Sequence, residues 1–474
     1  MENIIELLYE NALNHGSKIA FVDDEKEMTY SRVFNEVITK ASYLRELGYR
    51  HDPIIVKVNR RVDTIIAFFS ILLSGNYYIP VDEDIPNYKL EQIIQISKAK
   101  SFISFKDEQL GIDKIYFQKP KKKLTYEDFS SEFDRDDYAY LMFTSGSTGE
   151  PKGVIKTHKN LISFVNNFLE TFTFLKEERI ANQAPFFFDA SAKDIYLTLK
   201  LCGTLFIPEK SVFSLPMESI NYLNVHKITM IYWVPSILSM VAKTRTLNFI
   251  QPKYLKYIFF VGEVFIPKYL NMWIESLPQI RYFNTYGSTE VSGISLFYEI
   301  KKPIETDFIP TGKPIKNNNV FLQDEEIVID SEQVAEGYIN RLNEGVFEKR
   351  NNKLLLHTGD YGRIDEDGNI IFTSRKDFQI KHLGYRIELQ EIEAVISEFS
   401  YVDQCCAVYN SEKDLIYLFA VLREQVDNPV KQILTDAKEK MQFYMIPNKV
   451  IIIDEMPLNK NSKIDRTTLK RMVQ

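Results

Sequence analysis

The feature that most constrains the fold is a repeated alternation of short apolar, β-branched runs with longer helical patterns. The first instance spans residues 54–81: an apolar run, a helical pattern over 62–73, a stop at Gly75 and a second apolar run. The same order recurs over residues 228–261. Parallel strands need a long crossover connection, usually a helix, so this alternation predicts the α/β class, with parallel sheets covered by helices.

At 474 residues the chain is too long for one hydrophobic core, and it predicts about two or three structural units. From Arg375 onward the pattern changes, with helical periodicity over 388–399 and 430–441 around two strand-like runs. We therefore expect a large N-terminal domain with mixed, largely parallel sheets, residues 1–376, and a small α+β C-terminal domain, residues 377–474.

Composition excludes several classes of protein. The net charge is −7 without a long basic run, which argues against nucleic acid as the main partner. A short basic run at 119–123 is typical of a solvated connector, with a basic binding patch as the alternative. Three cysteines suit a reducing cytoplasm rather than a disulfide framework. The apolar stretch at 65–73 is too short to span a membrane, and the N-terminus does not have the pattern of a secretory signal.

The most informative segment is an apolar strand from Tyr140 that enters a loop rich in glycine and hydroxyl residues. Glycines let the backbone approach an anion closely, and hydroxyls with an ammonium complete a polyphosphate site. The spacing does not match the Walker A pattern, and a flexible turn is the alternative. The candidate phosphate-binding residues are Thr144, Ser145, Gly146, Ser147, Thr148, Gly149 and Lys152.

This segment resembles the signature loop of the adenylate-forming superfamily, which includes acyl-CoA synthetases, luciferases and nonribosomal-peptide adenylation domains. Further segments resemble the other motifs of the superfamily in the same order, and the resemblance spans essentially the whole chain. These segments are residues 73–82, 284–290, 357–363, 374–388 and 457–466.

The resemblance implies ATP and Mg²⁺ as cofactors. Tyr286 offers a ring face for the purine, Glu290 a hard oxygen ligand for Mg²⁺, and Asp360 an acceptor for the ribose hydroxyls. Taken singly, each has an ordinary structural alternative, such as a core tyrosine or a turn aspartate. Further ATP-binding residues implied by the resemblance are Asn284, Thr285, Gly287, Arg375 and Lys463. The implied catalytic residues are Lys463, Lys152, Thr289 and Glu290.

The implied reaction is attack of a substrate carboxylate on the α-phosphorus of ATP, with release of pyrophosphate. Lys463 would bridge the carboxylate and the α-phosphate, and the C-terminal domain would act as a mobile lid. By resemblance, Asp377 is the hinge, and Lys381 and Gly384 belong to the surface used for thioester formation. An ordinary interdomain linker is the alternative for these three residues.

Residues 185–196 resemble the motif of amino-acid-activating members, in which an aspartate at the position of Asp189 pairs with the substrate's α-ammonium. A helix N-cap is the alternative for this aspartate. Lys193 is unusual in a dry pocket; it would pair with an acidic or polar substrate side chain, or with Asp194. The implied pocket residues are Asp189, Ala190, Lys193, Tyr232, Phe259, Val261, Thr285, Gly293 and Ile294.

The chain ends eight residues after Arg466. We therefore expect a freestanding ligase that loads an amino acid onto a separate phosphopantetheinylated carrier protein, similar to D-alanine ligases; an excised module is the alternative. Ser288, Ser462 and the pair His382–Leu383 depart from the motifs, and the last change bears on how a carrier or CoA docks. The rival functions are a carboxylate–CoA ligase and a non-catalytic nucleotide-binding relative.

Overall fold

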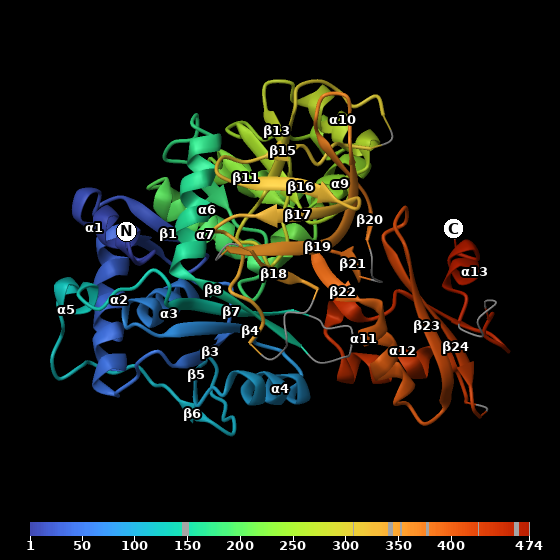
Figure 1. The fold of residues 1–474 in the computed structure, drawn as a ribbon, viewed down its shortest axis with the longest axis horizontal. Helices are drawn as coiled ribbons and strands as arrows, with labels where there is room; N and C mark the ends of the chain where they lie inside the picture. Colours follow the sequence, from blue (N-terminus) through green and yellow to red (C-terminus); the bar gives the residue numbers. More distant parts are fainter. Residues whose placement is uncertain are drawn as a thin grey trace. The chain divides into compact units, whose positions relative to one another are not determined.

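The computed structural model describes residues 1–144, 151–306, 308–339, 345–350, 353–375, 379–424, 426–458 and 464–473 (Figure 1). The chain forms two compact units. The first unit consists of Met1–Glu83, Ile94–Phe143 and Gly153–Ser374. The second consists of Asp84–Ile93, Thr144–Lys152 and Arg375–Gln474.

Among the described residues, the largest sheet has nine strands in the order β15–β14–β13–β12–β11–β9–β10–β1–β2. The strands from β13 to β1 in this order are parallel, and the edge strands β2, β14 and β15 pair antiparallel. The bounds are β1 (Ile19–Val22), β2 (Glu27–Thr29), β9 (Arg179–Ala181), β10 (Thr204–Phe206), β11 (Met230–Trp233), β12 (Tyr257–Val261), β13 (Arg281–Tyr286), β14 (Leu296–Ile300) and β15 (Lys313–Pro314).

A second sheet, six-stranded in the described part of the chain, has the order β6–β5–β3–β4–β7–β8 and is parallel from β6 to β7. Its bounds are β3 (Pro53–Val58), β4 (Tyr77–Asp82), β5 (Ser101–Ile103), β6 (Asp113–Lys114), β7 (Tyr138–Thr144) and β8 (Lys152–Thr157). The helices before β20 are α1 (Glu6–Asn14), α2 (Tyr30–Glu46), α3 (Val62–Leu73), α4 (Asn87–Ser97), α5 (Tyr126–Ser130), α6 (His158–Thr171), α7 (Asp189–Lys200), α8 (Pro216–Val225), α9 (Pro235–Lys243) and α10 (Pro267–Ser276).

Both faces of the nine-stranded sheet are buried, because alternate side chains of its parallel strands enter two different cores. Tyr232, Phe259 and Phe283 point to the core that contains α3, α6 and α7 and the six-stranded sheet. Trp233 and Phe260, their neighbours in sequence, point to the core formed with α8, α9 and α10. The expected α/β architecture, with parallel sheets covered by helices, is confirmed.

Local sequence explains where the central helices begin. Thr157 and Asn160 form a capping box at the start of α6: each side chain accepts a hydrogen bond from the backbone N–H of the other. Prolines stand in the first turn of α8, α9 and α10, where the missing N–H costs nothing. Eleven of the twelve residues of α3 are buried, so this helix is apolar all round and lies inside the core.

A third sheet completes the first unit. Its strands β16–β17–β19–β18 pair antiparallel, and β20 pairs with β19. Val154 and Tyr286 pack into the core beneath this sheet. The bounds are β16 (Asn319–Gln323), β17 (Glu326–Asp330), β18 (Phe347–Arg350), β19 (Lys353–Ile364) and β20 (Ile370–Arg375).

The C-terminal part of the second unit is α+β, as expected. The hairpin β21–β22 is followed by a sheet in the order β23–β24–β25, with β23 antiparallel and β25 parallel to β24. The bounds are β21 (Gln379–His382), β22 (Tyr385–Glu388), β23 (Val402–Asn410), β24 (Leu415–Leu422), β25 (Lys449–Ile452), α11 (Leu389–Ser397), α12 (Pro429–Lys440) and α13 (Arg466–Arg471).

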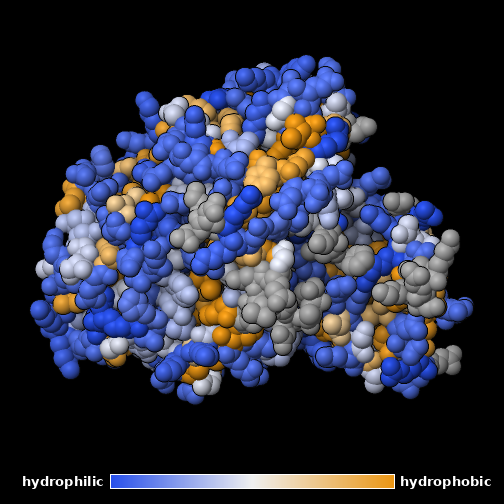
Figure 2. Space-filling model, in the orientation of Figure 1, coloured by the Kyte–Doolittle hydropathy of each residue, from blue (hydrophilic) through white to orange (hydrophobic). Residues whose placement is uncertain are grey.

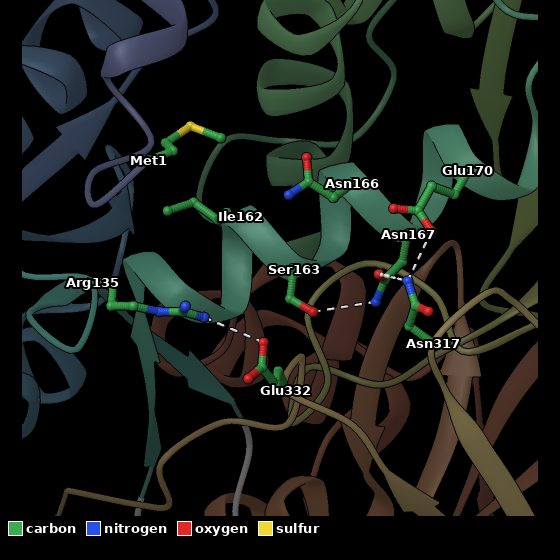
Figure 3. Close-up of a pocket in the computed structure, with 9 residues that line it drawn as sticks. All are labelled: Met1, Arg135, Ile162, Ser163, Asn166, Asn167, Glu170, Asn317 and Glu332. Carbon is green, nitrogen blue, oxygen red and sulfur yellow. Dashed lines mark hydrogen bonds and ion pairs between the residues drawn. The ribbon is translucent and has the colours of Figure 1, made fainter.

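Hydrophilic residues cover most of the face shown in Figure 2, and apolar residues gather there in small patches. None of the helices in the described ranges combines the length and hydropathy needed to cross a membrane. A cavity of about 520 Å³ lies along α6, and none of the predicted site residues lines it. Its lining residues are Met1, Arg135, Ile162, Ser163, Asn166, Asn167, Glu170, Asn317 and Glu332, and Figure 3 shows several of the polar ones paired with one another.

Candidate active site

A buried carboxylate stands in the first turn of α7. Phe188 is the N-cap residue, so Asp189 is the first residue of the helix and not its cap. Asp189 is 7% exposed, and its Oδ1 accepts a hydrogen bond of 2.9 Å from the hydroxyl of Tyr140 on β7. Its Oδ2 makes no hydrogen bond to the described residues. This oxygen therefore keeps its capacity to accept a hydrogen bond from a cationic ligand.

Opposing effects act on the charge of this carboxylate. Burial raises the pKa of Asp189, whereas the positive charges of Lys156 and Lys193 and the Tyr140 hydrogen bond lower it. An isolated carboxylate in an apolar interior would take up a proton. Among the described residues, the two lysines and the tyrosine favour the anion.

Lys193 does not form the ion pair with Asp194 that the sequence left open. Its side chain is 4% exposed, and its ammonium lies 5.0 Å from the centroid of the Tyr232 ring, in cation–π contact. Asp194 instead accepts a hydrogen bond of 2.9 Å from Nδ2 of Asn182. Burial lowers the pKa of Lys193, and raises that of Asp194 to about 7. The ammonium of Lys193 is thus largely dehydrated and lies over an aromatic ring. Among the described residues, no carboxylate is in hydrogen-bond contact with it.

The expected pocket residues of β11, β12 and β13 lie on one face of the nine-stranded sheet. The ring of Tyr232 stacks on Phe259, and its hydroxyl lies 2.5 Å from that of Thr285, which donates to the Phe260 carbonyl. Gly293 has a φ of +72°, and a Cβ there would lie 2.1 Å from the Phe164 ring. Val261 and Ile294 are buried in the same core, and Ala190 is half-buried on α7.

The structure brings together two residues of separate motifs that were expected at the nucleotide. The Tyr286 hydroxyl, at the end of β13, donates a hydrogen bond of 2.5 Å to Oδ2 of Asp360 on β19. Asp360 is 2% exposed and follows Gly359, whose φ is +69°. Asn284 donates to the Pro310 carbonyl. A tyrosine and a carboxylate in contact form one polar edge, which suits a ligand with both a ring and hydroxyl groups.

Glu290, the expected metal ligand, is buried in the segment after β13. Its Oε1 accepts a hydrogen bond of 2.8 Å from the Tyr338 hydroxyl, and its backbone carbonyl accepts one from Ala335. Thr289 next to it is half-buried. Gly287 lies close to the backbone of residue 293, with no room for a side chain. Within the described ranges, no cluster of three or more His, Cys, Asp or Glu side chains forms a metal site.

Lys156 is a charged residue of this region that the sequence interpretation missed. It lies on β8 and is 0% exposed, and among the described residues the charges of the Asp189 and Glu290 carboxylates raise its pKa. Burial has the larger effect and lowers the Lys156 pKa to about 8. The sequence did contain a signal for the burial of Lys156. It stands two positions after Val154 in one short apolar strand, so the two side chains share a face.

Other predicted residues lie in the second unit. Thr144 ends β7, and Lys152 begins β8. Arg375 donates through Nη2 to Oε1 of Gln379 at 2.7 Å. Lys381 lies on β21, and Gly384, with a φ of +82°, lies in the turn between β21 and β22. Several predicted residues lie outside the described ones, namely Ser145, Gly146, Ser147, Thr148, Gly149, Asp377 and Lys463.

Solved structures share this fold. A Vibrio cholerae adenylation domain in complex with glycyl-adenosine-5'-phosphate superimposes with a TM-score of 0.84 at 18% identity, covering 99% of this chain and 96% of that one. An o-succinylbenzoate CoA synthetase from Bacillus subtilis gives a TM-score of 0.83 at 20% identity, covering 98% of both chains. The fold is therefore common to proteins that activate different acids, and it does not by itself separate them.

Sequence comparison is more specific. A family model described as AMP-binding enzyme matches residues 8–339, and one described as AMP-binding enzyme C-terminal domain matches residues 391–463. The D-alanine–D-alanyl carrier protein ligase of Staphylococcus haemolyticus is 30% identical over 484 residues, which cover 98% of this chain and 98% of that protein. These matches, together with the motifs, show that the chain belongs to the AMP-binding enzymes of the adenylate-forming superfamily.

Proposed function

We propose that this protein activates an amino acid as an aminoacyl-adenylate, and then transfers the aminoacyl group to the phosphopantetheine thiol of a separate carrier protein. The observation that carries the proposal is the buried Asp189 carboxylate, which is held by Tyr140 and presents Oδ2 without a hydrogen-bond partner in the described residues. A substrate ammonium supplies the cationic partner that such an oxygen lacks. The full-length similarity to a D-alanine–D-alanyl carrier protein ligase supports the same assignment.

The reaction has two steps. In the first, an oxygen of the substrate carboxylate attacks the α-phosphorus of ATP, the bond from this phosphorus to the bridging oxygen breaks, and pyrophosphate leaves. In the second, the carrier thiol loses its proton, its sulfur attacks the acyl carbon, a thioester forms and AMP leaves. Because the first nucleophile is already an anion, that step depends on positioning and on positive charge rather than on a general base.

The Tyr286–Asp360 pair is our candidate for the nucleoside, with the tyrosine ring at the base and the carboxylate at the ribose hydroxyls. We assign the β- and γ-phosphates to Lys152 and to the loop of residues 144–149. Glu290 fits Mg²⁺, because this ion usually takes one or two carboxylates and completes its shell with phosphate oxygens and water. When bound, Mg²⁺ would offset negative charge on the phosphates.

We assign the C-terminal domain, residues 377–474, to a mobile lid with its hinge at Asp377. Lys463 would bring the positive charge that joins the substrate carboxylate to the α-phosphate. Lys463→Ala should abolish ATP–pyrophosphate exchange while ATP binding persists. Asp377→Pro should spare exchange and slow thioester transfer, because a hinge must change its backbone angles between the two steps. Equal loss of both steps in the hinge variant would contradict this role.

We further propose that the substrate side chain is acidic or strongly polar. An apolar side chain would leave the Lys193 ammonium dehydrated over the Tyr232 ring, whereas a carboxylate would supply its missing partner. The D-alanine ligase similarity provides the competing expectation of a small side chain. We place this protein in the cytoplasm, because its three cysteines are unpaired and the proposed reaction consumes ATP.

The decisive experiment is ATP–pyrophosphate exchange with each amino acid in both configurations and with simple carboxylic acids. We expect exchange with an amino acid, loss of exchange in Asp189→Asn, and a mass increase of one aminoacyl group on a phosphopantetheinylated carrier protein. Preference for a carboxylic acid without an amine, with transfer to CoA, would instead indicate a carboxylate–CoA ligase. Failure of every acid in the exchange assay would indicate a nucleotide-binding relative without this activity.

A further inference from the structure

Lys156 places a buried ammonium in the first unit without a carboxylate partner among the described residues. Lys156 is 0% exposed, and its Nζ is buried without a hydrogen-bond partner among the residues that the structure describes. In the described residues no carboxylate lies within ion-pair distance of it. A buried ammonium without a partner is costly, and deleting such a charge commonly stabilises a protein. Packing alone therefore gives no reason for a lysine at this position in an apolar strand.

The surroundings of Lys156 define what its charge does. β8 lies next to β7, from which Tyr140 reaches Asp189, and Ile155 on β8 pairs with the segment that carries Tyr338, the partner of Glu290. The chain thus places the ammonium in the field of two carboxylates that come from different elements. Lys156 is also the cation with the larger effect on Asp189, ahead of Lys193.

We propose that Lys156 is a positioning residue that acts as the internal counter-ion of Asp189 and keeps this carboxylate ionised for the substrate ammonium. The proposal rests on the function proposed above. Lys156 supplies charge without occupying a lone pair of Asp189, because the two side chains are not hydrogen-bonded. A direct ion pair would have covered the oxygen that the ligand needs, so the separation is what lets one carboxylate serve both cations.

The other charges near Asp189 do not perform this role. Lys193 is held over the Tyr232 ring, and its charge interacts with Asp194 as well as with Asp189. Glu290 opposes ionisation, because like charges repel. In the described part of the chain, the other titratable groups around Lys156 and Asp189 are the hydroxyls of three tyrosines and, farther away, Asp194 and Arg60. The tyrosines are Tyr140, Tyr78 and Tyr196. Without Lys156, Lys193 would be the one lysine among the described residues that favours the Asp189 anion. Burial and the charge of Glu290 would both oppose ionisation.

The test compares Lys156→Met with wild type, because methionine matches the length and removes the charge. The probes are amino acids paired with the same acid without its amine, D-alanine with propionate and L-glutamate with glutarate. The KM of each is measured by pyrophosphate exchange between about pH 6 and 8.5. We expect the amino-acid KM to rise at least about tenfold at neutral pH and to recover as the pH rises and Asp189 ionises. The KM of the amine-free acid should change less than about threefold.

Two variants control the comparison. Lys57 is another nearly buried strand lysine of the same sheet, ion-paired to Glu108, and Lys57→Met should leave both KM values unchanged. Lys156→Arg keeps a positive charge and should retain the preference for the amine. If the methionine variant does not fold, Lys156→Gln takes its place, and it should again lose the preference for the amine.

Equal changes for both members of a probe pair, at all pH values, would overturn the proposal and leave Lys156 a structural role. An unchanged preference would overturn it as well. Asp189→Asn separates this failure from a failure of the proposed function. If Asp189→Asn keeps the preference for the amine, the assignment of Asp189 is wrong; if only the Lys156 variants keep it, the counter-ion proposal alone is wrong.

Discussion

Tyr140→Phe offers the sharpest test of how the proposed amino-acid site is built. The variant removes one hydroxyl, the donor of the 2.9 Å hydrogen bond to Asp189, and both residues are buried. A hydrogen bond to a charged group contributes about 1.5–3 kcal/mol. If that energy holds the carboxylate ionised and oriented, its loss should raise the amino-acid KM about 10- to 150-fold.

The pH dependence has a definite sign. The hydrogen bond from Tyr140 lowers the Asp189 pKa, so its removal raises that pKa further. Because the anion is the form that binds an ammonium, the acid limb of kcat/KM should move to higher pH in the variant. The assay is pyrophosphate exchange with the preferred amino acid between about pH 6 and 8.5. The KM for ATP is measured in parallel as a reference that should not change.

Tyr78→Phe is the matched control. Its hydroxyl is also buried, lies 2.9 Å from that of Tyr196, and belongs to a ring stacked against Tyr140. The control removes a buried hydroxyl from the same tyrosine cluster without removing a bond to Asp189, and it should leave the amino-acid KM within about threefold. A Tyr140→Phe enzyme with wild-type KM and acid limb, or a control with an equal defect, would refute the reasoning.

Three further predictions concern stability and the nucleotide. Gly293→Ala places a Cβ 2.1 Å from the Phe164 ring at a φ of +72°, and should lower the free energy of unfolding, measured with denaturant, by about 2–5 kcal/mol. The control Gly368→Ala has a φ of +77° but open space around the new Cβ, and should lower it by about 1–2 kcal/mol. Burial lowers the His158 pKa to about 3 from 6.5, so its neutral form stabilises the fold above pH 6.5 and this contribution is lost as pH falls toward 3; His158→Gln should flatten the acid side of a plot of melting temperature against pH. Tyr286→Phe should raise the KM for ATP about 3- to 30-fold with an unchanged amino-acid KM, and equal changes in both would contradict a nucleoside role.

Much of the fold was predictable because it depends on periodicity. The run 257–261 is β12 without a shift, and the helical pattern 62–73 is α3 with the same bounds. The apolar pattern of β23 is clear only over residues 406–409, whereas the strand extends over Val402–Asn410. The remaining residues include Gln404, which is polar but pairs with Val421 of the neighbouring strand, and Asp403, which lies at the register shift beside it. Tertiary pairing, which the local pattern does not carry, decides such ends.

The site was harder to predict because it depends on pairs that are distant in sequence. Asp189 stood out in its own motif, but its partner Tyr140 is 49 residues earlier in a strand that reads as ordinary apolar chain. The Tyr286–Asp360 contact joins two motifs 74 residues apart. Lys193 was singled out, yet its contact with Tyr232, rather than with the adjacent Asp194, follows only from the direction of side chains on α7. Sequence patterns identified chemistry-bearing residues, and packing decided which of them lie in contact.

The distribution of charge bears on which side chain the pocket prefers. Lys156 and Lys193 both act on Asp189, but they differ in what a substrate can offer them. In the proposed complex, the substrate ammonium approaches Asp189 and increases the positive charge near both lysines. A side-chain carboxylate near Lys193 would offset that increase, and an apolar side chain would not. Sites that hold a polar group for the substrate reject analogues lacking it far more strongly than apolar pockets reject a missing methylene. Hence a lysine over an aromatic ring should discriminate against D-alanine by more than pocket volume alone, and Lys193→Met should shift the preference toward small or apolar amino acids.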